Sequence, residues 1–173
     1  MHVLEQMPRC TVRIEELLGE AVIGTGTGFY YGFCLQPDGG AVNGIVTNKH
    51  VIAGASHVRI RVHVTQINYE PHVPTQFVSV DIPLDSVVEH PNPAIDLCVV
   101  PAQRAFDAIR NTHQMHPSFI KLAAEHVADA ACLEQLLPFE SVRMVGYPIG
   151  IWDHVNNAPI VRRGSLATSP SVD

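Results

Sequence analysis

Charged side chains are scarce in this chain, and the basic ones are the minority. Of the 173 residues 16% are charged, with 11 Lys and Arg against 17 Asp and Glu, which leaves a formal net charge of −6. A nucleic-acid-binding protein needs a basic face to displace the counterions of the phosphates, so this balance predicts no nucleic-acid partner. No apolar run reaches the roughly 18 residues of a membrane-spanning helix, so no membrane partner is predicted either.

Signals for secretion and for disulfides are missing as well. The N-terminus reads M-H-V-L-E-Q-M-P-R-C and lacks the basic patch followed by an apolar stretch that marks a secretory signal. The four cysteines, Cys10, Cys34, Cys98 and Cys132, are scattered, and no two form a C-x-x-C pair. Together these absences favour reduced thiols and a cytoplasmic location.

The first hundred residues contain the pattern of short β-strands. Alternating or β-branched stretches predict strands over 10–15, 21–33, 41–47, 57–67, 77–82 and 97–100. The stretch at 57–67, H-V-R-I-R-V-H-V-T-Q-I, alternates almost perfectly, which places one face in the core and the other in water. Q-P-D-G-G at 36–40 predicts a turn. Short strands at close spacing with Gly/Pro turns predict an all-β fold, either a barrel or a sandwich.

The composition changes after Pro101. Residues 105–110 and 117–137 carry Ala, Leu, Glu and Gln with apolar residues at helical spacing, which predicts a short, partly helical connector. Strand patterns return in V-R-M-V-G-Y-P and P-I-V-R-R-G-S-L-A. The predicted organisation is a first β unit over 1–100, a connector over 101–140 and the start of a second β unit over 141–173, whose two strands are too few to close a barrel.

A glycine cluster, G-T-G-T-G-F at 24–29, raises the question of a nucleotide cofactor. A dinucleotide site needs G-x-G-x-x-G where a helix opens after a strand, but here the spacing is G-x-G-x-G and β-forming aromatics follow. A phosphate loop needs Lys-Ser or Lys-Thr after its last glycine, and that pair is absent. The cluster therefore predicts a strand bend or bulge and no cofactor.

Most of the ten histidines have ordinary interpretations. His113 and His116 form an H-x-x-H pair without a Cys or carboxylate at ligand spacing, which favours a solvated loop over a zinc site. His57 and His63 share one side of the alternating stretch and are expected on its exposed face. His90, in E-H-P-N-P, is expected in a turn.

One histidine differs because of its partner. His50 ends the strand pattern I-V-T-N-K-H-V-I-A-G, and 46 positions later Asp96 immediately precedes the apolar run L-C-V-V. A carboxylate at the entrance to a β core is costly unless a cation or a hydrogen-bond donor meets it, and no helix follows for it to cap. An imidazole is the natural partner, because Asp–His pairing fixes the ring tautomer and stabilises the imidazolium.

Four motifs occur in an order that resembles one family: G-T-G-F before a strand, T-N-K-H-V-I at a strand end, D-L-C-V-V, and V-G-Y-P-I-G. From roughly residue 10 onward the chain resembles the trypsin-like serine peptidases of the two-barrel chymotrypsin fold. Within them it is most similar to bacterial intracellular trypsin-like peptidase domains, in which G-Y-P-x-G precedes a segment like W-D-H-V-N-N-A-P-I-V-R-R-G at 152–164.

The resemblance implies a double six-stranded β-barrel, with the second barrel incomplete in this chain, and a protein or peptide substrate. It implies that His50 is the general base, that Asp96 is its orienting carboxylate, and that Thr47 and the residues around Ala53 frame the histidine. It implies neither a metal nor an organic cofactor.

The family also implies a serine nucleophile in a G-x-S-G-like loop, whose backbone N–H groups form the oxyanion hole. None of the eight serines has that context: Ser165, in R-R-G-S-L-A, has one flanking glycine, and Ser169 and Ser171 flank a proline. In the family the nucleophile lies further along, beyond the strand that would follow Asp173. We therefore expect a serine endopeptidase domain whose 173-residue chain is inactive by itself.

Two other functions stay open. An inert pseudo-peptidase would act as a protein-binding or scaffolding module, and the unpaired edges of an incomplete second barrel favour strand addition by a partner or self-association. A zinc protein built on the many histidines is the third interpretation.

Overall fold

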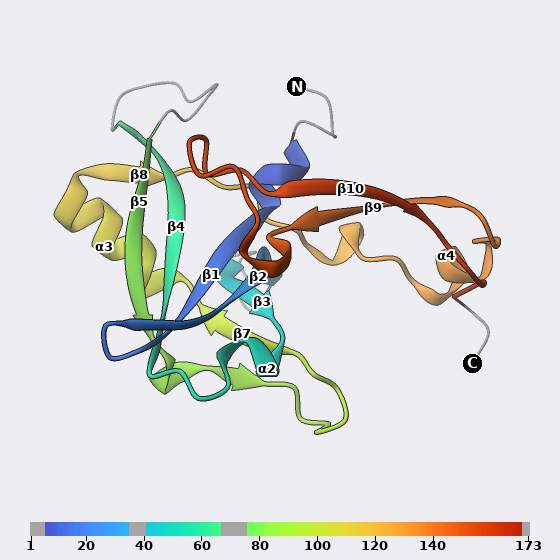
Figure 1. Ribbon diagram of the computed structural model, residues 1–173, viewed down its shortest axis with the longest axis horizontal. Helices are drawn as coiled ribbons and strands as arrows, with labels where there is room; N and C mark the ends of the chain where they lie inside the picture. The colour runs from blue at the N-terminus through green and yellow to red at the C-terminus, as the bar shows by residue number, and fades with distance from the viewer. Residues whose placement is uncertain (1–5, 35–40, 67–75, 171–173) are drawn as a thin grey trace.

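The computed structural model describes residues 6–34, 41–66 and 76–170 (Figure 1). The turn predicted at 36–40 and the predicted strand end at Ile67 lie outside these residues. The described residues form one large antiparallel sheet, a separate two-stranded ribbon and a few short helices, which confirms the all-β class. Within this part of the chain, no helix is long and apolar enough to cross a membrane.

The large sheet has the strand order β5-β4-β1-β2-β3-β7-β6, and β8 also pairs with β4. Its strands are β1 (Thr11–Leu18), β2 (Ala21–Cys34), β3 (Ala41–Thr47), β4 (His57–Gln66), β5 (Gln76–Pro83), β6 (Val88–Glu89), β7 (Cys98–Pro101) and β8 (Met115–Pro117). All six strands predicted for the first hundred residues are present. No ladder among the described residues joins β5 to β6 or β7, so the pairing is that of an open sheet and barrel closure stays a prediction.

Strand β4 shows how alternation builds the core. Four of its residues are at most 2% exposed, and the residues between them are half-buried. The buried residues are Val58, Ile60, Val62 and Val64. Helix α3 (Gln103–His113) packs against this core with Phe106, which is fully buried and stacks on Phe119 with ring centroids 4.6 Å apart. Burial of each such side chain stabilises the fold by about 1.5–3 kcal/mol.

The connector is partly helical, as the sequence predicts: α3 contains residues 105–110, but residues 117–137 are helical only in two short stretches. Only η3 (Ala124–His126) and α4 (Ala130–Glu134) form there, and the residues before them run beside β2. The N–H of Leu122 donates to Tyr30 O and its carbonyl accepts from the N–H of Gly32, both at 2.8 Å. Strand β2 continues past the start of β1, which pairs only as far as Phe29. The segment satisfies the backbone groups that β1 leaves unpaired, and this requirement outweighs helical propensity.

The second β unit is a two-stranded ribbon of β9 (Ser141–Gly146) and β10 (Ile160–Ser165), as its sequence predicts. In Figure 1 the ribbon runs away from the large sheet. The remaining short helices are η1 (Met7–Cys10), α2 (Lys49–Ile52), η2 (Leu84–Ser86) and η4 (Pro148–Gly150).

The loop between the ribbon's strands docks onto β1 and β4. The guanidinium groups of Arg13 and Arg61 lie 4.9 and 4.8 Å from the centre of the Trp152 ring. Asn157 is 2% exposed and donates from Nδ2 to Arg61 O at 3.2 Å. The W-D-H-V-N-N stretch, which the sequence identified only by resemblance, therefore joins the two β units through cation–π contacts and hydrogen bonds.

This docking corrects the expectation that His63 lies on an exposed face. Its Nε2 lies 3.1 Å from Asn157 O, and the side chain is half-buried beneath the loop. Burial lowers the pKa of His63, because the charged ring is less well solvated there. Alternation located the outer side of β4 correctly, but it could not show that a segment about 90 residues later covers part of that side.

Candidate active site

The site forms where β3 ends and a single helical turn, α2, begins. Val51 of α2 is 8% exposed and packs on Gly26 of β2, where an added Cβ would lie 2.3 Å from Val51 Cγ1. Gly26 of the glycine cluster therefore provides a flat strand surface on which α2 packs. Because Val51 is anchored, the neighbouring His50 is presented at the rim of the sheet.

His50 and Asp96 lie within hydrogen-bond reach, as the sequence predicts. The backbone N–H of His50 donates to Asp96 Oδ1 at 3.1 Å, and its ring Nδ1 contacts Asp96 Oδ2. The His50 side chain is 71% exposed and that of Asp96 is 48% exposed. With Nδ1 directed at the carboxylate, Nε2 is the ring nitrogen left to face solvent.

Three neighbouring groups fix the loop that carries Asp96. Asn48 donates from Nδ2 to Asp96 O at 2.7 Å, and Lys49 Nζ donates to His90 O at 3.1 Å. His90 closes the loop through its N–H, which donates to Leu97 O, and its Nδ1 accepts from the N–H of Asn92. His90 is thus the turn residue that the sequence predicts.

The hydrogen bond from the His50 ring, joined by the one from its backbone N–H, holds the pKa of the Asp96 carboxyl below its usual value. We expect His50→Ala to raise that pKa toward about 3.9, the value of an unperturbed Asp. Carboxyl-carbon NMR titration of both proteins measures the change. Because folding lowers this pKa, the stabilisation it brings is present above about pH 3.9 and is lost as the pH falls through the folded-state value.

Asp81 provides the internal control for this titration. Hydrogen bonds from Arg59 lower its pKa, so it should titrate identically in the wild type and in His50→Ala. An Asp96 titration that is the same in both proteins would contradict the contact between His50 and Asp96 in solution.

Thr47 anchors the strand end that precedes His50. It is 3% exposed, and its hydroxyl donates to Thr27 O at 2.9 Å. The hydroxyl of Thr27 in turn accepts from the N–H of Tyr147 at 2.8 Å. Residues from the T-N-K-H, G-T-G-F and V-G-Y-P motifs are therefore joined by one chain of hydrogen bonds, and this supports the framing role that the resemblance implies for Thr47.

A hollow of about 510 Å³ opens beside His50, between α2 and the segment from η2 to β6. Ile52, Leu84 and Val87 give it apolar walls, and Lys49 and Glu89 lie at its rim. Across β1 and β2, Glu16 lies against Gly24, and partial burial raises the pKa of its carboxyl while the nearby His50 opposes that rise. Sequence spacing gave no sign of this second carboxylate near the histidine.

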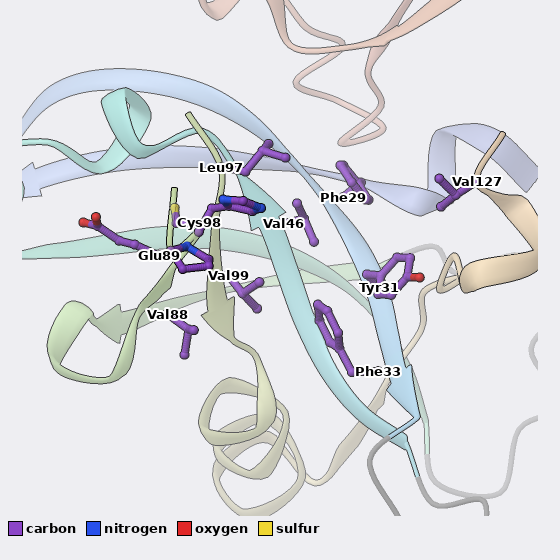
Figure 2. A pocket seen from close by; sticks show the side chains of 12 residues that line it. Phe29, Tyr31, Phe33, Val46, Val88, Glu89, Leu97, Cys98, Val99 and Val127 are labelled. Carbon is purple, nitrogen blue, oxygen red and sulfur yellow. The ribbon is translucent and has the colours of Figure 1, made fainter. Parts of the chain in front are cut away.

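A second, apolar hollow of about 450 Å³ is lined in part by Leu97, which follows Asp96 in the chain (Figure 2). Figure 2 shows Phe29, Tyr31 and Phe33 in a row along β2, with Val46 and Val99 beside them. Cys98 also lines this hollow, and burial raises the pKa of its thiol. The wall is almost wholly apolar, which suits packing better than polar chemistry.

None of the described serines makes a hydrogen bond with His50. Ser118 accepts a hydrogen bond from Arg9, Ser141 accepts one from Arg163, and Ser169 donates one to Leu136 O. None of these partners is His50 or Asp96. Ser165 ends β10, and Ser171 lies outside the described residues. The structure thus brings together the predicted base and its carboxylate without a nucleophile among the described serines.

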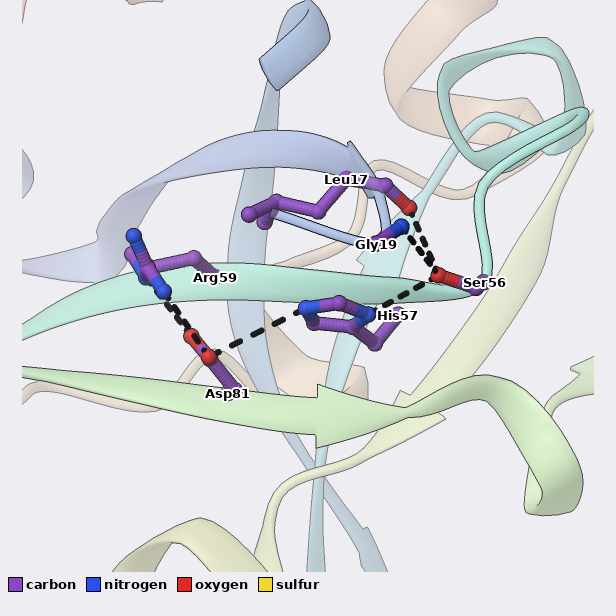
Figure 3. A network of polar contacts seen from close by, with 6 residues as sticks. All are labelled: Leu17, Gly19, Ser56, His57, Arg59 and Asp81. Atoms are coloured by element: carbon purple, nitrogen blue, oxygen red, sulfur yellow. Dashed lines mark hydrogen bonds and ion pairs between the residues drawn. The ribbon is translucent and has the colours of Figure 1, made fainter. Parts of the chain in front are cut away.

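A second set of Ser, His and Asp occurs at the start of β4 (Figure 3). His57 Nδ1 lies 2.9 Å from Ser56 Oγ, and its Nε2 lies 3.8 Å from Asp81 Oδ2. Local sequence patterns do not reveal this set, because Asp81 comes from β5 and reaches His57 only through the pairing of β4 with β5.

The other partners of Ser56 indicate a structural role. Its hydroxyl lies 3.1 Å from Leu17 O, which takes its single hydrogen, and its oxygen accepts from the N–H of Gly19 at 3.3 Å. His57 is then a donor to Ser56 and not its base. Asp81 is held by Arg59 through two hydrogen bonds of 2.7 and 2.9 Å. Ser56 therefore clamps the turn between β1 and β2.

We expect Ser56→Ala to lower the free energy of unfolding by about 1 kcal/mol, because Leu17 O and the Gly19 N–H lose a partner. Urea denaturation of the purified protein measures this. Ser79→Ala is the matched control, since Ser79 is exposed on β5 and should change stability by less than about 0.5 kcal/mol. Equal effects of the two substitutions would contradict the clamp.

No group of three or more His, Cys, Asp or Glu side chains in the described part of the chain could hold a metal ion. Comparisons with protein-family models, curated proteins and solved structures found no match to this chain. The sequence motifs and the geometry around His50 therefore carry the functional argument.

Proposed function

We propose that this chain is part of a trypsin-like serine endopeptidase in which His50 is the general base and Asp96 orients it. The observation that carries the proposal is the contact of His50 Nδ1 with Asp96, which leaves Nε2 directed to solvent. The order of the four motifs and the hydrogen-bond chain from Thr47 to Tyr147 support it. The two-barrel fold, bacterial origin and cytoplasmic location belong to the same proposal.

Each residue has a defined role in this chemistry. His50 Nε2 takes the proton of the serine hydroxyl as that oxygen attacks the peptide carbonyl, and it later protonates the leaving amine. Asp96 holds the proton on Nδ1 and stabilises the imidazolium that forms. The acyl-enzyme is then hydrolysed by water, again with His50 as the base. No cofactor takes part, and a peptide segment is the substrate.

A fluorophosphonate probe, which labels activated serines, tests the proposal on the 173-residue protein. We expect no labelling, because a base and its carboxylate do not activate a serine that they do not contact. Serine-specific labelling, located by peptide mass spectrometry, would contradict this and would point to Ser165 or Ser169 as the nucleophile.

A protein-binding module is the second candidate, and the exposed β9–β10 ribbon favours it. As a pseudo-peptidase, the chain would bind a partner by strand addition or self-association at that ribbon. The coding sequence beyond Asp173 distinguishes the two functions. A G-x-S-G stretch within the next few dozen codons supports the peptidase, and a stop codon supports the binding module.

A further inference from the structure

We propose that the outer edge of β10 binds an extended acidic segment of a partner protein, with two adjacent carboxylate residues opposite Arg162 and Arg163. The inference rests on the strand-addition role proposed above and is independent of hydrolysis at His50.

The ribbon has a free edge that a strand could extend. β10 pairs with β9 from Ile160 to Ser165, and no other described segment pairs with its outer side. All but the first residue of β10 are exposed, and β9 is exposed over its first four residues. An isolated two-stranded ribbon is only marginally stable in water. A third strand would give hydrogen-bond partners to the backbone N–H and C=O groups along the outer edge of β10.

The ribbon is also strongly cationic within an acidic protein. Arg143, Arg162 and Arg163 are exposed on it, and neither strand contains an acidic residue. Arg143 and Arg163 are direct cross-strand partners, a pairing of like charges that is unfavourable by itself. None of the three forms an ion pair with another described residue; Arg163 instead donates from Nε to Ser141 Oγ at 2.9 Å. An incoming carboxylate would relieve this repulsion.

The register defines what the partner strand carries. Arg162 and Arg163 are adjacent, so their side chains point to opposite faces of the ribbon. A strand added beside β10 needs one carboxylate on each face, which means two consecutive Asp or Glu residues. An apolar residue next to that pair would pack beside Val161 on β10, which is 53% exposed.

A second copy of this chain is a poor occupant of the same edge. Antiparallel pairing of β10 with itself would place arginines near arginines. The chain does have an acidic pair with apolar neighbours, Glu15 and Glu16, but both lie in β1, which already pairs with β2 and β4. The charge and the register therefore favour a different protein.

Peptide binding tests the inference directly. The probe is an eight-residue peptide with a central Glu-Glu pair flanked by Val and Thr, and the matched control has Gln-Gln in its place. We expect the Glu-Glu peptide to shift the amide NMR signals of β10 and to bind at least about 5-fold more tightly than the control at low salt. The difference should shrink as salt screens the charges.

Charge reversal supplies the decisive variants. The double variant Arg162→Glu, Arg163→Glu should no longer prefer the Glu-Glu peptide over the Gln-Gln peptide. It should instead bind a Lys-Lys peptide more tightly than the Gln-Gln control. Arg104→Glu with Arg110→Glu, which changes the net charge equally on α3, should preserve the preference for Glu-Glu. His50→Ala should leave binding unchanged, which separates this inference from the peptidase proposal.

Three results would overturn the inference. Equal binding of the Glu-Glu and Gln-Gln peptides would retain strand addition but reject an acidic partner. Sedimentation showing a dimer with protected β10 amides would identify a second copy as the occupant. Binding of neither peptide, with β10 amides that exchange freely, would reject strand addition at this edge.

Discussion

On the proposed mechanism, Asp96→Asn should lower the kcat for peptide hydrolysis about 10⁴-fold in the protein translated from the complete reading frame. An asparagine NH₂ group facing His50 Nδ1 favours the tautomer that carries its proton on Nε2. That nitrogen can then no longer accept the serine proton. His50→Ala removes the base itself and should lower kcat about 10⁶-fold. A fluorogenic peptide library identifies a substrate, and steady-state kinetics on it measure both variants.

Asp81→Asn is the matched control for this measurement. Asp81 is also a surface carboxylate near an imidazole, that of His57, and it too has a lowered pKa, but its main partner is Arg59. We expect its kcat to stay within about 3-fold of the wild-type value, in keeping with a structural role. The assignment of Asp96 would be contradicted if Asp96→Asn kept a tenth of the wild-type kcat. A loss of kcat in Asp81→Asn instead would contradict it too.

The strands of the first β unit were predictable because their signals are local. The alternation of β4 depends only on which residues face the core, and Val58 to Val64 show that pattern in the sequence itself. The His50–Asp96 pair was predictable for a different reason. Each residue stands at the end or entrance of a strand, and a charged group at such a place needs a specific partner.

Two other features depend on contacts between distant segments that left no signal in the sequence, and these could not be predicted. The connector at 117–137 has helical spacing, yet Leu122 pairs with the part of β2 that β1 does not reach. His63 has the alternation of an exposed residue, yet Asn157 lies over it. Both outcomes follow from backbone and ring groups that find partners about 90 residues away, and no window of the sequence shows those partners together.

The packing of Gly26 under Val51 explains how His50 is held in place although its side chain is exposed. The single turn of α2 has only four residues and no side-chain cap, so it has little stability of its own. Val51 is its one buried residue, and Gly26 is the surface that receives it. The position of His50 therefore depends on this contact more than on any bond within α2.

Gly26→Ala should lower the free energy of unfolding by about 1–3 kcal/mol and separate His50 from Asp96. The new Cβ would lie 2.3 Å from Val51 Cγ1 and 2.9 Å from Cγ2, and a β-branched side chain cannot move aside without its backbone. Urea denaturation measures the destabilisation. Carboxyl-carbon NMR should show the pKa of Asp96 rising as its hydrogen bonds from His50 weaken.

Two further variants identify the cause of the Gly26→Ala effect. Gly164→Ala makes the same change on β10, where the nearest atom, Val142 Cγ2, would be 3.8 Å away, so we expect a change of less than about 0.5 kcal/mol there. Val51→Ala combined with Gly26→Ala makes room for the new methyl group, so the double variant should lose less stability than the sum of the two single variants. Additive losses would show that the glycine acts through the backbone of β2 and not through its contact with Val51. Restoration of the low Asp96 pKa in the double variant would show that this contact positions His50.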